Sequence, residues 1–337
     1  MTTNIYIKSF NRPYFLDRCL YSIYRYMTGN YRVIILDDGT PLKYIDRVKE
    51  KYPQVIFQFS DDAVKKRTEI EQAIRTGEEH YTRSIPLQFW HDTVEQGSGY
   101  FLLTEDDIWV TAPVDVDAYV QLMKAKKMNT IKLRWWGNEN TNVGERVLLS
   151  GEVEAVIPKI HFAAEWIVKN RFYIHAVLSR LKLIKGTFFQ QLYTYYEVGG
   201  VFFDKRYWLF LYSGRLDSRV EEMVQLGKAA EWARKHPETM FGKCITEAGR
   251  STYLTSAAGG YNGQTGFSMT MVNHYLNDEW YRGKFDSMQN FPEDYALDTV
   301  YDILQKSGDP KCDPEKWKKW SRDFQAHFVR IGASPKG

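Results

Sequence analysis

The stretch YFLLTEDDIWV, residues 100–110, is the most informative part of the sequence. It opens with an apolar run, Tyr100 to Leu103, and then places Glu105, Asp106 and Asp107 side by side before the chain turns apolar again. A short apolar run bounded by polar residues is consistent with a buried strand. Neighbouring carboxylates repel one another. The three acids therefore either cap a turn in contact with solvent or bind a cation.

The residues before this stretch alternate between strand and helix patterns. After the first strand, Leu16, Leu20, Ile23 and Met27 recur at the spacing of one helical face. The same reasoning predicts strands at 4–7, 33–36, 55–59 and 100–103, and further helices at about 44–51 and 85–95. Such alternation predicts the α/β class, with a mostly parallel central sheet flanked by helices.

Polar residues follow three of these strands. Asn11-Arg12 comes after the first strand, Asp37-Asp38 after the second and Glu105–Asp107 after the fourth. Ligands of open parallel sheets bind beyond the carboxyl ends of the strands. The sequence therefore predicts one site where the three clusters meet. Mg²⁺ and Mn²⁺ prefer carboxylate oxygens and commonly bind one or two of them together with substrate phosphates, so either ion suits this site.

Composition limits the classes of function. The formal charge of +3 gives no argument for a nucleic-acid partner. No run approaches the roughly 18 apolar residues of a membrane span, and no signal peptide is visible at the N-terminus. The three cysteines are widely spaced and form neither a disulfide framework nor a metal pattern. A cytoplasmic protein is expected.

The second half of the chain has a mixed pattern. Strands are predicted at 130–136, 153–157 and 241–246, a helix at 217–235 and a glycine-rich loop at 256–266. The pair Asp313-Pro314 is typical of a helix start. The helix that follows has an aromatic face flanked by basic residues, which either packs on the protein itself or rests on a membrane; the face comprises Trp317, Trp320, Phe324 and Phe328.

The motifs IYIKSFNRPYFLDRCLYSI, YRVIILDDGT and FLLTEDDIWVTAPVDVDAYV resemble GT-A glycosyltransferases of the family-2 type, in the order that this family has them. The acidic motif is more similar still to that of N-acetylglucosaminyltransferase I-like enzymes. The resemblance extends over about residues 4–125 and is faint from there to about 270. It implies a GT-A catalytic domain at 1–255, with a nucleotide-sugar half at 1–110 and an acceptor half at 111–255, and a mainly helical C-terminal extension at 256–337.

The resemblance also implies a role for each matched residue. A nucleotide-sugar donor, UDP- or GDP-linked, would bind at the first two loops and at an arginine before the acidic strand, and these residues are Phe10, Asn11, Arg12, Asp37, Asp38 and Arg83. Asp107 would be the main ligand of Mn²⁺ or Mg²⁺, with Glu105 as a second ligand and Asp106 as a supporting or ribose-binding group. For Arg12 and Arg83 the alternative is a surface ion pair.

Inverting sugar transfer needs a carboxylate that takes the proton of the acceptor hydroxyl. By resemblance this acid is Glu222, with Glu221 as second choice, and Glu165 is a competitor; both glutamates of the pair could also be solvated helix residues. Members of the family often carry a metal-binding histidine after the last strand. Here that position has no histidine, and His274 lies about twenty residues too far along the chain.

The resemblance thus implies an inverting glycosyltransferase that moves a sugar to a glycan or lipid-linked acceptor, with peripheral membrane contact through the last helix as an option. Two rival functions stay open. A non-catalytic sugar-binding relative would keep the fold and lose the base. A sugar nucleotidyltransferase would share the sheet and the acids, but its glycine-rich signature is missing from SFNRP, residues 9–13.

Overall fold

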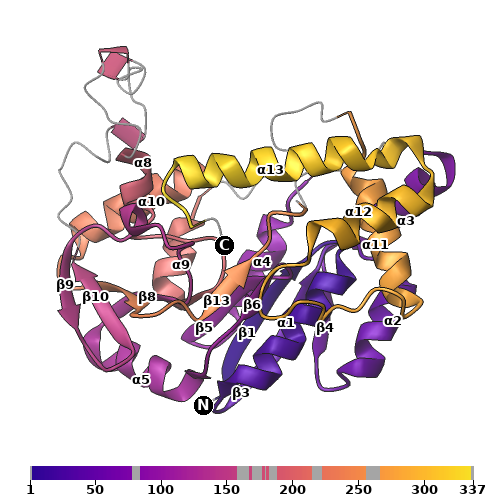
Figure 1. The fold of residues 1–337 in the computed structure, drawn as a ribbon. Coiled ribbons are helices and arrows are strands. Elements are labelled where there is room, and N and C mark those ends of the chain that lie inside the picture. Colours follow the sequence, from indigo (N-terminus) through magenta and orange to yellow (C-terminus); the bar gives the residue numbers. More distant parts are fainter. Residues whose placement is uncertain are drawn as a thin grey trace.

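The computed structural model describes residues 2–77, 84–157, 167–168, 177–178, 180–181, 188–214, 222–255 and 266–334. Within this part of the chain the centre of the molecule is a nine-stranded sheet (Figure 1). Its strands lie in the order β4 (Ile56–Phe59), β3 (Tyr31–Asp37), β1 (Thr3–Ser9), β5 (Tyr100–Glu105), β11 (Val201–Asp204), β8 (Met128–Lys132), β12 (Met240–Cys244), β10 (Val153–Ile157) and β9 (Glu145–Leu148).

The sheet is mostly parallel. Strands β4, β3, β1 and β5 pair in parallel with one another in that order, and β8 pairs in parallel with β12. Only β11 and β10 of the described strands are antiparallel to the strands on both sides. The predicted α/β class is therefore confirmed.

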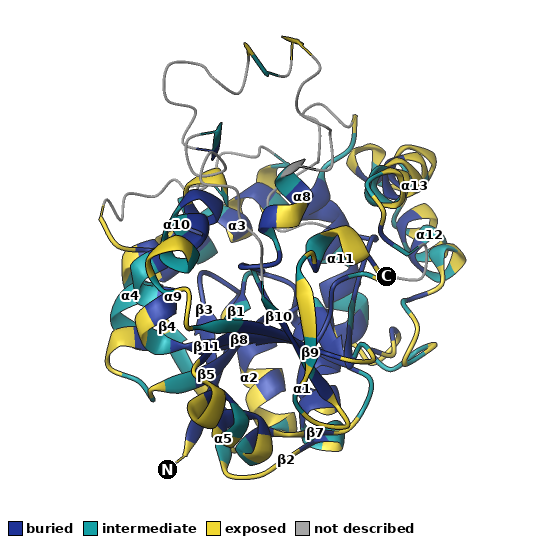
Figure 2. Ribbon diagram, turned by 90° about the vertical axis from the view of Figure 1, so that its left-hand side faces the viewer, coloured by how far each residue is buried: buried dark blue, intermediate teal, exposed yellow. Residues whose placement is uncertain are grey.

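Helices cover both faces of the sheet, with buried inner sides and exposed outer sides (Figure 2). One core includes residues of α1 (Pro13–Tyr26), α2 (Leu42–Lys51), α5 (Val116–Lys126), α11 (Met269–Tyr281), α12 (Leu297–Ser307) and α13 (Pro314–Arg330). The other includes residues of α4 (Leu87–Glu95), α8 (Phe188–Leu192), α9 (Lys205–Leu211) and α10 (Glu222–Lys235). Helix α3 (Ala63–Thr76) contacts α11.

Short elements complete the described chain: the strand pairs β2 (Met27–Thr28) with β7 (Val114–Asp115) and β6 (Ile108–Val110) with β13 (Gly249–Ser251), and the 3₁₀ helices η1 (Glu139–Thr141) and η3 (Pro310–Cys312). None of the described helices combines the length and apolar character that crossing a bilayer requires.

The central strands alternate between the two cores. In β1, Ile5 and Ile7 belong to the core beneath α1, whereas Tyr6 belongs to the opposite one. In β5, Leu102 faces the first core, and Phe101 and Leu103 face the second. Successive side chains of a strand point to opposite faces, so a strand covered on both sides must be apolar throughout. This explains the unbroken apolar runs of the sequence.

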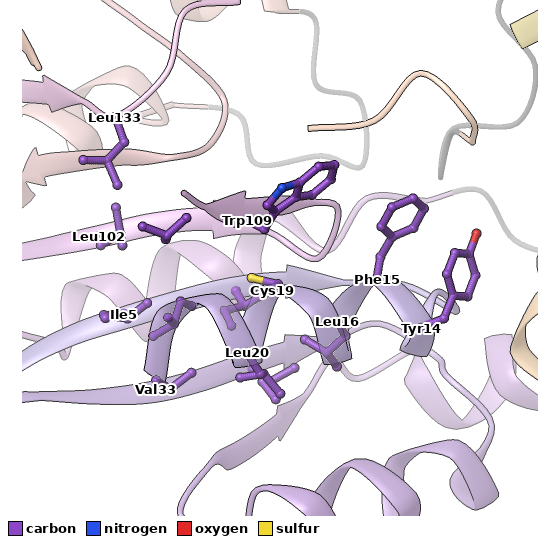
Figure 3. Close-up of a cluster of buried hydrophobic side chains, with 14 of the residues drawn as sticks. Ile5, Tyr14, Phe15, Leu16, Cys19, Leu20, Val33, Leu102, Trp109 and Leu133 are labelled. Atoms are coloured by element: carbon purple, nitrogen blue, oxygen red, sulfur yellow. The ribbon is translucent and has the colours of Figure 1, made fainter. Parts of the chain in front are cut away.

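The core beneath α1 is well filled with aromatic and aliphatic side chains (Figure 3). Phe15 stacks on Trp109 with ring centroids 6.4 Å apart. Arg18 is fully buried in the same region, with its guanidinium 4.5 Å from the Trp109 ring centroid and 4.4 Å from that of Tyr295. Its nitrogens also donate to backbone carbonyls, among them that of Gln289. Aromatic faces and carbonyls thus replace the water that this charge loses on burial.

Most predicted elements are present, with shifted ends. The strand expected at 130–136 is β8, which begins at Met128 and ends at Lys132. The helix expected at 217–235 is α10, described from Glu222 onwards. Helix α3 and the reversed strand β11 were not predicted. Most of the glycine-rich loop at 256–266 lies outside the described residues.

The aromatic face of α13 packs onto the protein. Trp317 is fully buried and donates from Nε1 to the carbonyl of Leu254 at 3.0 Å. Trp320 stacks on Phe324, and Phe328 stacks on Trp136 with centroids 4.9 Å apart. Asp313 caps the helix as expected, because its side chain accepts from two backbone N–H groups of the first turn. The packing alternative is confirmed for this face, and membrane contact stays a prediction.

Removing the largest of these contacts should loosen the C-terminal helices. We expect Trp317→Ala to lower the free energy of unfolding by about 3–5 kcal/mol, because it leaves a cavity and an unpaired carbonyl at Leu254. Lys319→Ala on the exposed side of the same helix should change it by less than about 0.5 kcal/mol. Urea unfolding of both variants measures the difference. Equal effects would contradict the packing described above.

Candidate functional site

The carboxyl ends of β3, β1 and β5 bring the polar clusters together. In the register of the sheet Ser9 lies opposite Asp37, and Lys8 lies opposite Glu105. Neighbouring strands are about 4.8 Å apart, so the loop after β1 lies next to the acids that end both flanking strands. The expected meeting of the three clusters at one edge of the sheet is confirmed.

Arg12 links the loop after β1 to the end of β5. Its Nη2 forms an ion pair with Asp106, and its Nη1 lies 2.7 Å from Oδ2 of Asp107. The backbone N–H of Phe10 donates to Oδ2 of Asp106 at 3.1 Å, and the N–H of Asp106 donates to the carbonyl of Lys8 at 3.0 Å. The guanidinium therefore does not form a surface ion pair, since Arg12 is only 4% exposed.

Burial and pairing act in opposite directions on these acids. Burial raises the pKa of Asp106 above its ordinary value, the Arg12 guanidinium opposes that rise, and the neighbouring charge of Asp107 adds to it. For Glu105, burial alone would raise the pKa, but Lys8, whose Nζ lies 2.7 Å from Oε1, acts together with the charges of Arg12 and Arg134 against burial, and the pKa is lowered. Glu105 is thus held ionised at the edge of the sheet.

Asp37 is fully buried and shapes its own turn. Its Oδ1 accepts from the N–H groups of Gly39 and Thr40, and its Oδ2 accepts from the hydroxyl of Thr40. Burial raises the pKa of Asp37 to about 6 against these hydrogen bonds. The Thr40 hydroxyl also accepts from the N–H of Asn11, a residue in the left-handed region with φ of 52°. The two loops therefore fix one another.

Asp38 forms a second buried ion pair. Its oxygens accept from Nζ of Lys66 and from the hydroxyl of Ser60, each at 2.5 Å. Lys66 is 1% exposed and also donates to the carbonyl of Ser84. Burial raises the pKa of Asp38, while Lys66 and Ser60 act against the rise. The lysine comes from α3, the helix that the sequence did not predict. Lys66 falls at helical spacing with the apolar residues Ala63, Ile70 and Ala73, and this pattern could have indicated the helix.

Two glycines before β11 form the floor between Glu105 and Arg134. A Cβ on Gly199 would lie 3.1 Å from Cγ of Glu105 and 2.8 Å from Cδ1 of Ile108. Gly200 has a φ of +72°, and a Cβ there would contact Cγ of Arg134 at 3.5 Å. Because β11 is reversed, its amino end reaches the same edge of the sheet as the carboxyl ends of its neighbours.

The turn after β8 has strained backbone. Trp136 and Gly137 both have positive φ, at 57° and 64°. The Glu247 carboxylate accepts from the N–H groups of Trp135 and Gly137 and so holds the turn from within. The end of α13 holds it from outside: Phe328 stacks on Trp136, and Ser334 N–H donates to the Trp136 carbonyl. Left-handed backbone in a tryptophan persists only where its surroundings over-determine it.

Glu222, the first residue of α10, lies within electrostatic reach of this edge. Burial raises its pKa, a hydrogen bond with Tyr193 acts against the rise, and the charges of Glu197 and Glu105 add to it. Tyr193 is fixed through its carbonyl, which accepts from the buried ammonium of Lys132 at 3.1 Å. Lys132 itself has its pKa lowered to about 7 by burial. Glu222 is therefore not an ordinary solvated helix acid.

Several predicted residues lie outside the described part of the chain: Arg83, Glu221 and the competitor Glu165. His274 is described, on α11. Its Nε2 lies 3.8 Å from Asp278, and burial lowers its pKa. None of its described contacts involves the acids at the end of β5. Among the residues that the sequence analysis did not single out, Lys8, Lys66, Arg134, Gly199 and Glu247 belong to this edge.

The acids at the end of β5 can supply only some of the ligand atoms that a divalent cation needs. Asp107 keeps its Oδ1, and Glu105 keeps its Oε2, without a partner among the described residues, whereas both oxygens of Asp106 are engaged. Within the described chain, three potential ligand atoms within 4.8 Å of one another occur at His91, Asp92 and Glu95 on α4, not at Glu105–Asp107. A cation at Asp107 and Glu105 would thus need ligand atoms from a bound phosphate.

Comparisons with known proteins give weak likenesses. The sequence matches no protein-family model and no curated protein. The structure resembles a mannosyltransferase (PcManGT) from Pyrobaculum calidifontis in complex with GDP-Man and Mn²⁺, at 9% identity over 99% of this chain and 76% of that chain, with a TM-score of 0.38. It also resembles S. aureus TarS 1-349 in complex with UDP-GlcNAc, at 10% identity over 97% and 92% of the two chains, with a TM-score of 0.33.

A third likeness is to the mannosyltransferase Ktr4p from S. cerevisiae, at 12% identity over 70% of this chain and 62% of that chain, with a TM-score of 0.33. All three TM-scores lie below 0.5, so these likenesses establish neither a family nor an activity for the chain.

Removal of Arg12 should expose the dependence of this edge on charge pairing. We expect Arg12→Met to lower the free energy of unfolding by about 3–5 kcal/mol at neutral pH, because it leaves buried Asp106 without its counter-charge, so that this acid must either stay ionised and unpaired or take up a proton. The folded-state pKa of Asp106 is already raised, and losing Arg12 raises it further. A carboxyl of this kind favours folding at acid pH and loses that contribution as pH rises through its folded pKa.

The deficit of Arg12→Met should therefore shrink towards acid pH, and Asp106→Asn added to it should recover part of the stability. Chemical unfolding of both variants at several pH values measures this. Arg206→Met is the matched control, because Arg206 is 81% exposed and pairs with Asp204 at the other end of β11. A deficit independent of pH would show that Arg12 acts by packing alone.

Proposed function

We propose that the chain is a metal-dependent, inverting glycosyltransferase that moves a sugar from a UDP- or GDP-linked donor to a hydroxyl acceptor of a glycan or lipid-linked kind. The observation that supports this most is the convergence of Arg12, Asp107, Glu105 and Glu222 on one edge of a mostly parallel sheet. Such an edge is where α/β sheets bind their ligands. This edge offers carboxylates for a cation, basic side chains for phosphate and a separate carboxylate, that of Glu222, for proton transfer.

The nucleotide would bind at the loops after β1 and β3. Phe10, Asn11 and Arg12 are proposed to border the base and ribose, in a loop that Asp106 and Thr40 hold in place. Asp38 is proposed to accept a hydrogen bond from the base or ribose. Asp37 contributes through the turn that presents Asp38, because its oxygens are occupied within that turn. Arg83 is proposed to face the base or the diphosphate.

Asp107 and Glu105 would hold Mn²⁺ or Mg²⁺, with Asp106 as the buried support that orients Asp107 through their common partner Arg12. The bound cation would neutralise charge on the leaving diphosphate. Arg12 limits the repulsion between Asp106 and Asp107 while no ligand is bound. Lys8 does the same for Glu105.

Glu222 is proposed as the general base, and Glu221 as its alternative. The acceptor oxygen would form a bond to the anomeric carbon, and the bond from that carbon to the diphosphate oxygen would break with its electron pair on the diphosphate. The proton of the acceptor hydroxyl would pass to the carboxylate of Glu222. A raised pKa suits this role, because a base poised nearer to neutral pH accepts a proton more readily.

Nucleotide binding should depend on the acids at the end of β5. We expect the protein to bind UDP or GDP more tightly with Mn²⁺ than without it, and Asp107→Ala to remove at least about tenfold of that gain, or about 1.4 kcal/mol. Calorimetry with and without Mn²⁺ measures both. Glu95→Ala, in the ligand group on α4, should leave the Mn²⁺ effect unchanged. If Glu95→Ala abolished the Mn²⁺ effect instead, the cation would have to be assigned to α4.

Turnover should depend on Glu222 separately from binding. We expect Glu222→Gln to slow release of nucleoside diphosphate from the donor sugar by roughly 100- to 10,000-fold with little change in donor KM, because the amide cannot accept the proton. Glu231→Gln on the same helix, where Glu231 pairs with Lys235, is the matched control.

In the unmodified protein the rate should fall as pH drops through the raised pKa of Glu222, since the base must be ionised. An unchanged rate in Glu222→Gln would transfer the role to another acid. Metal-dependent nucleotide binding with no turnover in the unmodified protein would favour the sugar-binding alternative.

A further inference from the structure

Arg134, two residues beyond β8, is a buried cation without a matching acid. The residue is 4% exposed, and its Nε and Nη1 are buried without a hydrogen-bond partner. Among the described residues no ion pair involves it, and its guanidinium contacts the ring of Trp136, whose centroid lies 4.9 Å from Cζ. The other basic residues of this edge, Lys8, Arg12 and Lys66, each pair with a carboxylate.

An unpaired buried guanidinium is unfavourable for folding, because the charge loses its water without gaining an opposite charge. The Trp136 ring offsets only part of this loss, since a contact with one aromatic face replaces neither the opposite charge nor the hydrogen bonds that the guanidinium lacks. Buried charges in native proteins are normally paired or bind a ligand. Arg18 is also buried, but it donates to two backbone carbonyls, whereas Nε and Nη1 of Arg134 have no partner among the described residues. Arg134 therefore points to an anion that the described chain does not supply.

The position of Arg134 indicates where this anion lies. Its side chain lies next to Gly200, and that of Glu105 lies next to Gly199, so the two glycines let both side chains approach the amino end of β11. The positive charge of Arg134 reaches Glu105 and contributes to lowering the pKa of that acid. Arg134 thus borders the end of β5, the place proposed above for the cation.

Charge balance favours a divalent cation and a diphosphate that bind together. The end of β5 has three acids, Glu105, Asp106 and Asp107, and three bases surround them, Lys8, Arg12 and Arg134. The edge is therefore close to neutral on its own. A divalent cation and a diphosphate diester offset one another, so they can bind together without leaving an excess charge.

We propose that Arg134 binds the diphosphate of the donor, from the side opposite to Arg12. This inference rests on the proposed function. As the bond from the anomeric carbon to the diphosphate oxygen breaks, its electron pair stays on that oxygen, and the guanidinium donates to the diphosphate as its charge grows. A hydrogen-bonding group that binds the diphosphate more strongly in the transition state than in the ground state accelerates the reaction, rather than merely holding the substrate.

The test compares Arg134→Gln and Arg134→Lys with the unmodified protein in Mn²⁺. Calorimetry with UDP and UMP, and with GDP and GMP, reports how much the second phosphate adds to affinity. Inorganic phosphate is titrated separately. Thermal unfolding of each apo variant tests whether Arg134 is structural. Arg206→Gln is the control, because that arginine lies at the far end of β11 and is exposed.

We expect Arg134→Gln to lower diphosphate affinity by at least about tenfold, to leave monophosphate affinity within about twofold, and to keep or raise Tm, because among the described residues the apo variant loses the ring contact with Trp136 but no ion pair. Arg134→Lys should recover part of the affinity, since an ammonium keeps the charge but not the forked geometry.

A lower Tm with unchanged diphosphate affinity would make Arg134 structural and overturn the inference. Unchanged diphosphate affinity with lost binding of inorganic phosphate would assign the guanidinium to an acceptor phosphate and overturn the donor assignment. If the unmodified protein binds neither diphosphate, the proposed function fails and this inference fails with it. If the unmodified protein binds the diphosphate and Arg134→Gln binds it equally well, the inference about Arg134 fails but the proposed function does not.

Discussion

The ion pairs of Arg12 with Asp106 and Asp107 are the constraint on which the candidate site depends. They join the loop after β1 to the end of β5 in a region from which water is nearly excluded. Two adjacent acids at a strand end would repel one another and favour an open edge. With a guanidinium between them, the same acids fix a loop, and no described residue donates a hydrogen bond to the second carboxylate oxygen of Asp107, which leaves it available to a ligand.

This constraint works because the sheet beneath it is rigid. Both faces of β1, β3 and β5 are covered by apolar cores, so the strands cannot shift register without exposing a full set of apolar side chains. The polar groups lie at the strand ends, outside the cores. Packing therefore fixes the backbone positions, and charge pairing fixes the side chains that extend from them.

The sequence predicted the parts that follow from local pattern. Strands β1, β3 and β5 and helix α1 have clear periodicity, and the polar clusters after the strands could be placed on one edge from the parallel order alone. The cap at Asp313 was equally readable, because it depends on two neighbouring residues.

The parts that were missed depend on contacts between distant segments. Nothing local indicates that β11 runs antiparallel between β5 and β8, or that Lys66 pairs with Asp38. The pairing of Arg12 with two acids 94 and 95 positions away was equally invisible. Arg134 in RWWGN could be noted as a residue near a strand end, but its lack of an acid partner is a property of the folded chain.

The turn after β8 has a consequence for the order in which the protein can acquire its structure during synthesis. Its strained backbone at Trp136 is held by Glu247 and by Phe328 and Ser334 near the end of the described chain. A ribosome releases the chain from the amino end, and segments fold as they emerge. The strands from β4 to β5 can pair early, but the turn beside Arg134 is not held in place until Phe328 and Ser334 have been made. A nascent chain would thus have its loops after β1 and β3 long before it has a complete site.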